Sequence, residues 1–195
     1  MLFAVGVFAQ PHSSSVLGTN ATPAVTVTLQ AGEYLGQQQV IRGIIANGTN
    51  TFMFVVPEGL RAAPSGEGGV VLTSRDGRCF LYIGIVGPPA EPGLKEALRQ
   101  RIASQYPNAR NLEEFAATVA DRVGLGFHLR QALPGVGDRL VQIVWVPFKV
   151  GLLEFTLNAD SSGASAGEGA FDMILLTFRS DERGRIEIVR RSDKT

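Results

Sequence analysis

The sequence predicts an α+β fold, an antiparallel β-sheet flanked by helices, with about three helices and seven to nine strands. Three observations support this prediction. Strand-like apolar runs lie on both sides of a central region with helical periodicity. Tight-turn pairs, Asn47-Gly48 and Asp76-Gly77, join successive strand-like runs as they do in antiparallel hairpins. A last apolar segment with helical spacing then offers a face that can cover the sheet.

The first half of the chain is predicted to form strands. Val25, Val27 and Leu29 alternate with polar residues, and this period of two is typical of a half-buried strand. Further strand-like segments follow at 34–46, 52–56, 69–74 and 78–86. Hairpins are predicted across Asn47 to Asn50 and across Arg75 to Gly77, because Asn-Gly and Asp-Gly pairs tolerate positive φ.

Two amphipathic helices are predicted next, over 92–105 and 111–123. The first places three apolar residues on one helical face: Leu94, Leu98 and Ile102. The second is predicted to begin at Asn111, which forms a capping-box pattern with Glu114. Its apolar stripe consists of Leu112, Phe115, Ala116, Val119, Ala120 and Val123.

The last third of the chain is predicted to return to strands and then end in a helix. Strands are predicted at 127–133, 139–147 and 152–158, and the second of them, continuously apolar, is expected to be central in the sheet. Asp160 to Gly169 is rich in small residues and is expected to be a loop. Residues 171–178 have helical spacing, and Ile186 with Ile188 suggests a terminal strand.

The N-terminal residues favour export. Leu2 to Phe8 are apolar, and Val7 and Ala9 stand at the two positions that a signal peptidase reads. A plain N-terminal strand is the alternative. We therefore interpret residues 1–23 as the remnant of an export signal and a flexible lead-in, and 24–195 as a single α+β domain. The expected location is periplasmic, secreted or envelope-associated, with no transmembrane segment in the mature chain, because no run of about 20 apolar residues exists.

The composition limits the possible partners and cofactors. Of 195 residues, 45% are hydrophobic, which suffices for a core without a metal or disulfide. Eighteen basic residues balance eighteen acidic ones, so a nucleic-acid partner is not expected. Cys79 is the single cysteine, and with two histidines, His12 and His128, it cannot complete a zinc site. No cofactor, metal ligand or catalytic residue is predicted.

Several segments resemble a known family. They are NTFMFVVPEGL, FLYIGIV, ADRVG, VQIVWVPFKVGLLEFTL and FDMILLTFRS. Their order over about residues 50–180 resembles the PsbP-like, or Mog-type, fold family, which includes DcrB- and LpqN-like bacterial lipoproteins. The resemblance implies an antiparallel sheet flanked by helices and a binding, assembly or envelope accessory role. No motif here matches the metal or calcium sites of its photosynthetic members.

One motif suggests an enzyme. Gly163 to Gly167 matches G-x-S-x-G, the pattern of a hydrolase nucleophile elbow centred on Ser165. No histidine follows Ser165, and His128 is the only base of that kind in the expected folded part. A serine needs such a base to act as a nucleophile, so a hydrolase using Ser165 is the less favoured alternative to a loop.

Three aromatic residues are the candidates for partner binding. Trp145, Phe148 and Phe155 fall on a predicted hairpin, where they either pack in the core or form an exposed patch. The predicted function is that of a non-catalytic exported domain that binds a protein or envelope component. The alternative is a binder of an apolar small molecule between sheet and helices, which requires a cavity of roughly 300 Å³ or more.

Overall fold

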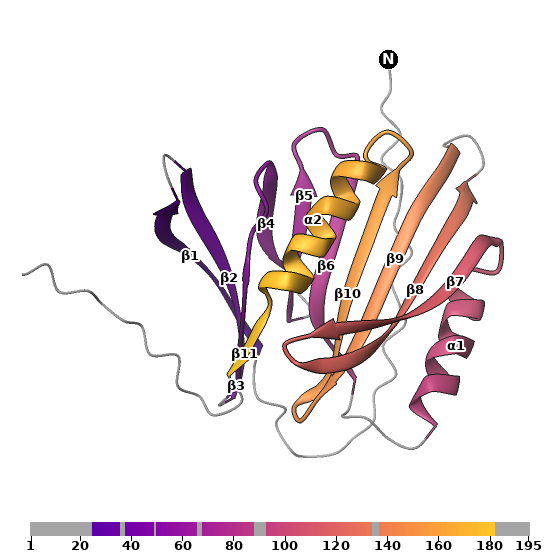
Figure 1. The fold of residues 1–195 in the computed structure, drawn as a ribbon, viewed down its shortest axis with the longest axis horizontal. Coiled ribbons are helices and arrows are strands. Elements are labelled where there is room, and N and C mark those ends of the chain that lie inside the picture. The colour runs from indigo at the N-terminus through magenta and orange to yellow at the C-terminus, as the bar shows by residue number, and fades with distance from the viewer. Residues whose placement is uncertain are drawn as a thin grey trace, which may run out of the picture.

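Two antiparallel sheets and two helices make up the described part of the chain (Figure 1). The computed structural model describes residues 25–35, 38–48, 50–65, 68–87, 93–133 and 137–181. The strands are β1 (Val25–Leu35), β2 (Gln38–Asn47), β3 (Asn50–Val55), β4 (Leu60–Ser65), β5 (Gly69–Ser74), β6 (Cys79–Gly87), β7 (Ala109–Val119), β8 (Arg122–Leu133), β9 (Gly137–Phe148), β10 (Gly151–Asp160) and β11 (Arg179–Asp181). The helices are α1 (Leu94–Gln105) and α2 (Ala164–Thr177).

The strand order confirms the predicted antiparallel sheet with helices. The smaller sheet has the order β1-β2-β3-β11, and the larger one β4-β5-β6-β10-β9-β8-β7. Every strand pair is antiparallel. The predicted hairpin at Asn47 to Asn50 is present, with Gly48 at φ 60°, and Gly77 in the next predicted turn has φ 70°. The strand expected to be central, β9, lies between β10 and β8.

The number of helices and strands was predicted wrongly. The described residues contain two helices and eleven strands, instead of about three helices and seven to nine strands. The main error is the helix expected over 111–123, where the chain forms β7, a turn and the start of β8. Ala120 and Asp121 make that turn at φ 47° and 61°. Within this segment Phe115, Ala117 and Val119 alternate with a period of two, so the sequence pattern fitted either structure.

Three smaller differences concern short elements. The edge strands β4 and β11 were not predicted. The expected loop between Asp160 and Gly169 is largely helical, since α2 begins at Ala164. The turn before it is held by the Asp160 carboxylate, whose Oδ1 accepts hydrogen bonds from the backbone N–H of Ser162 at 2.9 Å and of Gly163 at 2.7 Å. Residues 1–23 and the strand expected at 186–188 lie outside the described residues.

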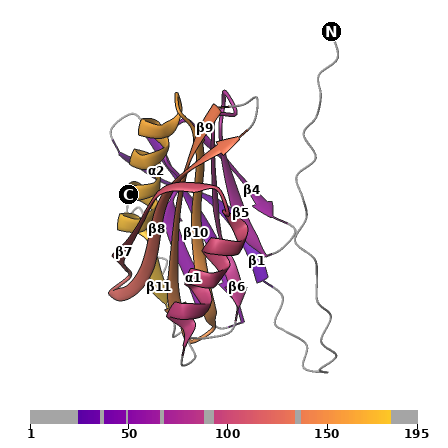
Figure 2. The ribbon, with the colours of Figure 1, turned by 90° about the vertical axis from the view of Figure 1, so that its right-hand side faces the viewer.

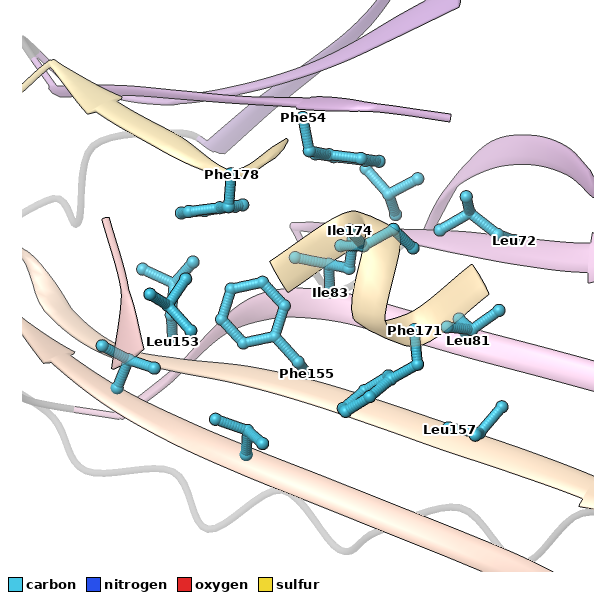
Figure 3. Close-up of a cluster of buried hydrophobic side chains, with 14 of the residues drawn as sticks. Phe54, Leu72, Leu81, Ile83, Leu153, Phe155, Leu157, Phe171, Ile174 and Phe178 are labelled. Atoms are coloured by element: carbon cyan, nitrogen blue, oxygen red, sulfur yellow. The ribbon is translucent and has the colours of Figure 1, made fainter. Parts of the chain in front are cut away.

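Helix α2 closes the main core by packing against both sheets. It contacts β10 and β6 of the larger sheet and β3 of the smaller one. At its C-terminal end the ring of Phe178 meets that of Phe155 edge-on at 4.9 Å and stacks on those of Phe52 at 5.8 Å and Phe54 at 6.4 Å (Figure 3). Because these rings are completely buried and come from both sheets and the end of α2, their packing joins the two sheets into one core.

Helix α1 covers the opposite face of the larger sheet (Figure 2). Leu98 and Ile102 are its buried residues. They share a second core with side chains of β8, β9 and β10: Phe127, Leu129, Val141, Ile143, Trp145 and Leu152. Along β9, Ile143 and Trp145 belong to this second core and Val144 and Val146 to the main one. From Ile143 to Phe148 the strand is apolar, because both of its faces are buried there.

Candidate functional site

An open groove lies between α1 and strands β7, β8 and β9. Its volume is about 460 Å³. Ala116, Leu125 and Trp145 lie opposite one another on adjacent strands and form a row across its floor. Leu94 and Leu98 of α1 form the wall. The groove exceeds the volume of roughly 300 Å³ that a small-molecule site requires, and its lining is mainly apolar.

A carboxylate on β10 fixes the groove floor. Glu154 Oε2 accepts a hydrogen bond from the Trp145 indole Nε1–H at 2.9 Å and another from Arg101 of α1 at 3.2 Å. Its Oε1 accepts one from the hydroxyl of Thr156 at 2.9 Å. The Arg101 guanidinium also lies 5.6 Å from the centre of the Trp145 ring, within cation–π range. These contacts hold the tryptophan ring in one orientation and tie α1 to the sheet.

Charged residues stand where the groove opens between α1 and β7. Glu114 Oε2 lies 2.7 Å from Arg99 Nε, and its Oε1 lies 3.0 Å from Lys95 Nζ. The hydrogen bond from Arg99, followed by that from Lys95, lowers the pKa of Glu114 from 4.5 to about 2, so the carboxylate is charged at neutral pH. Exposed ion pairs of this kind contribute little to stability. Their consequence here is geometric, because they keep the two charged lining residues, Lys95 and Glu114, paired at the margin of an apolar surface.

The groove margin on β8 is apolar and exposed. Val123 lines the groove and leaves 69% of its surface accessible, and Pro147 of β9 lines the groove with it. Among the described residues that line the groove there is no serine, threonine, cysteine or histidine. The arrangement is suited to holding an apolar group against a rigid floor.

The three predicted aromatic residues are buried. Trp145, Phe148 and Phe155 have 1%, 2% and 0% of their surface exposed, so they pack in the two cores and do not form the exposed patch considered above. Phe148 and Phe155 belong to the main core, and Trp145 belongs to the core beneath α1. Of the three, Trp145 lines the groove.

The candidate catalytic residues lie on different elements. Ser165 is exposed in the first turn of α2, and His128 lies in the middle of β8. Neither side chain makes a hydrogen bond or ion pair with another described residue. The G-x-S-x-G segment forms a turn and the start of a helix after β10. Among the described residues, no group of three histidine, cysteine, aspartate or glutamate side chains is placed to hold a metal ion.

Sequence reasoning identified one side of the groove and missed the other. Helical spacing predicted the face of α1 that carries Leu94 and Leu98. Ala116 and Val123 were assigned to the stripe of a helix, whereas they lie on two paired strands. The signal that could have placed them is the alternation of Phe115, Ala117 and Val119, which pack against the main core, with exposed residues between them.

Comparison with solved structures finds PsbP-like proteins. A cyanobacterial PsbP (CyanoP) from a Synechocystis species aligns at a TM-score of 0.47 with 15% identity, over 66% of this chain and 85% of the other. LpqN of Mycobacterium tuberculosis, described as involved in cell envelope biogenesis, aligns at 0.47 with 16% identity, over 84% of this chain and 99% of the other. The chain is similar to solved PsbP-like structures.

Comparisons at the sequence level add no further relative: no family model matches the chain, and no curated protein matches it significantly. Within the described residues, neither helix has the length and apolar character needed to cross a membrane.

Proposed function

We propose that this protein binds an apolar or amphiphilic small molecule in the groove beside α1, without transforming it. The observation that carries the proposal is a volume of about 460 Å³ with a mainly apolar lining, in which Lys95 and Glu114 are the charged members among the described residues. Ligand sites commonly have this character, with mainly apolar walls and few polar groups that set orientation.

The shape of the lining favours a chain-like or flat apolar ligand. Ala116, Leu125 and Trp145 form a single row of side chains across three neighbouring strands, and this row is the floor of the groove. Leu94 and Leu98 form one wall. An apolar group placed there would lose water on two sides. A polar head attached to it would lie near Lys95 and Glu114, still in contact with solvent, because both are partly exposed.

We propose that the protein is exported and that it binds its ligand without a chemical reaction. The apolar run from Leu2 to Phe8 supports export, so the ligand we expect is one found outside the cytoplasm or in the envelope. The two ionisable residues that line the groove, Lys95 and Glu114, are paired with each other, and this pairing supports binding over catalysis.

A protein or other envelope component is the second candidate partner. It is favoured by the exposed apolar side chains of α2, Met173 and Leu176, the latter 75% accessible. The groove beside α1 carries the proposal because its lining is mainly apolar, and a concave apolar site suits a small ligand.

Filling the groove tests the proposal. The probe is cis-parinaric acid, a fluorescent fatty acid, titrated into the full chain. Ala116→Phe places a ring in the groove at an exposed strand position, and Ala166→Phe makes the same change at an exposed position of α2. We expect saturable binding by the natural protein, a loss of roughly tenfold or more in affinity for Ala116→Phe, and no change for Ala166→Phe.

Two results would contradict the proposed function. One is the absence of saturable binding by the natural protein. The other is equal binding by the two phenylalanine variants, since that would place the fatty acid elsewhere. Far-UV circular dichroism of both variants establishes that they are folded.

A further inference from the structure

The two sheets have four edge strands, and three of them carry features that prevent pairing with another chain. Strand β4 has six residues and contains Pro64, which has no N–H to donate. Strand β7 has a register shift between Arg110 and Glu113, where Asn111 takes a positive φ of 51°. Strand β11 has only three residues. Short strands, prolines and bulges are the usual protections of exposed sheet edges.

Strand β1 carries such features only at its C-terminal end, where the pairing with β2 shifts between Ala31 and Tyr34 and the sequence contains Glu33. It pairs with β2 in a regular ladder from Val25 to Ala31, and no described strand lies on its outer side. From Val25 to Gly32 its sequence is VTVTLQAG, without a charge or a proline. A regular, uncharged edge of this length leaves a row of backbone donors and acceptors available to another strand.

We propose that β1 pairs antiparallel with β1 of a second copy of this chain, around a two-fold axis at Thr28. In that register the apolar face would place Val25 opposite Ala31 and Val27 opposite Leu29 of the partner subunit. The other face would place Thr26 opposite Gln30 and Thr28 opposite itself. Every cross-strand pair is then apolar with apolar or polar with polar, the combinations that stabilise paired strands. A two-fold axis makes the contact self-complementary and closed.

Exposed apolar side chains at this edge support a second copy as the occupant. Leu29 and Ile41 are 40% and 43% accessible. Ala31 lies opposite Ile41 in the β1–β2 ladder, so both exposed residues belong to the face that Val27 shares with the main core. In the proposed dimer the partner subunit's Val27 would lie beside Leu29. The smaller sheets of the two copies would become one continuous sheet.

The size of the contact sets the expected strength. A single strand pairing over about seven residues buries less than a standard protein interface, so the dimer should form in the micromolar range or above. A strand from another protein, or the residues that precede β1, could use the same edge. Both alternatives predict a monomer when the full chain is studied alone.

The test is sedimentation velocity of the full chain over a series of concentrations up to several hundred micromolar. Thr28→Lys puts two lysines opposite each other at the axis, and Thr28→Glu does the same with two carboxylates. Thr28 is exposed, so each variant should fold. Thr118→Lys, at an exposed position of the edge strand β7, is the matched control.

We expect the natural chain and Thr118→Lys to dimerise equally, and each Thr28 variant to raise the dimer dissociation constant by roughly tenfold or more. An equimolar mixture of Thr28→Lys and Thr28→Glu should restore dimers, because lysine then meets glutamate across the axis. This restoration separates pairing from a loss of folding. A natural chain that stays monomeric throughout, a Thr28→Lys variant that dimerises normally, or a mixture that stays monomeric would overturn the proposal.

Discussion

The turn between β7 and β8 gives the sharpest test of the fold, because it lies where the sequence pattern indicates a helix. Ala120 is at φ 47° and Asp121 at φ 61°. Two consecutive residues with positive φ are the signature of a two-residue type I′ hairpin turn. In a helix the same residues would have negative φ. Replacing Ala120 by glycine should therefore change stability in opposite directions in the two structures.

The size of the effect follows from three contributions. A left-handed conformation costs a residue with a Cβ about 1–2 kcal/mol, and Ala120→Gly removes that cost. Glycine loses about 0.5–1 kcal/mol through its greater freedom in the unfolded chain. The alanine methyl is half-buried against the main core, and its removal costs about 0.4 kcal/mol. The sum ranges from a loss of about 0.4 kcal/mol to a gain of about 1.1 kcal/mol in the free energy of unfolding, with a midpoint at a gain of about 0.4 kcal/mol, whereas a helix interior would lose about 1 kcal/mol.

Urea unfolding, followed by the fluorescence of Trp145, measures the difference. Trp145 is the single tryptophan and is buried, so its emission reports the global transition. Ala116→Gly is the control, because Ala116 lies in the interior of β7 and should lose about 0.5–1 kcal/mol. Asn-Gly in place of Ala120-Asp121 should gain about 1 kcal/mol. If Ala120→Gly is destabilised as much as Ala116→Gly, the hairpin assignment is refuted.

Three further predictions concern α2, the ion pairs at α1 and the buried thiol. Gly167→Ala should lower the free energy of unfolding by about 1 kcal/mol, because the new Cβ would lie 3.0 Å from a side chain of β10. Gly169 has open space around it, so Gly169→Ala should raise the free energy of unfolding by about 0.5–1 kcal/mol in the same denaturation assay. The Glu114 carboxyl should titrate near pH 2 when it is followed by NMR, and Arg99→Gln should move that midpoint upward. Because the pKa of Glu114 is lowered in the folded chain, its contribution to stability is complete above about pH 4.5 and is lost as the pH falls through 2. Burial raises the pKa of the Cys79 thiol to about 11, so it should react with a disulfide reagent at pH 8 only after unfolding, and rapid reaction of the folded chain would contradict its placement.

Local chemistry explains which parts of the fold were predictable. The turn at Asn47-Gly48 and that at Gly77 were found because glycine and asparagine accept positive φ regardless of the rest of the chain. Helix α1 was found because Leu94, Leu98 and Ile102 share one helical face, whereas the polar Glu96 and Gln100 between them would interrupt the apolar face of a strand. These features depend on residues a few positions apart.

The errors arose where local patterns fit two structures. The turn at Ala120-Asp121 carries no glycine, so nothing in the sequence separated β7 from β8. The start of α2 is rich in glycine and alanine, which resembles a loop. It is helical because Gly167 allows close approach to the sheet, where the small residue fits beside Cys79 and Ala159. Tertiary packing overrode local preference at both positions.

Residues close together in the sequence were enough to predict antiparallel hairpins and a hydrophobic core. Local patterns did not reveal that β10 pairs with β6 and β11 with β3, or that the face of α1 meets β7, β8 and β9 beside an open groove. Strand periodicity and turn chemistry are set by neighbouring residues. The partners of each strand and the position of a groove are set by which apolar faces exclude water together, and those faces are distant in the sequence.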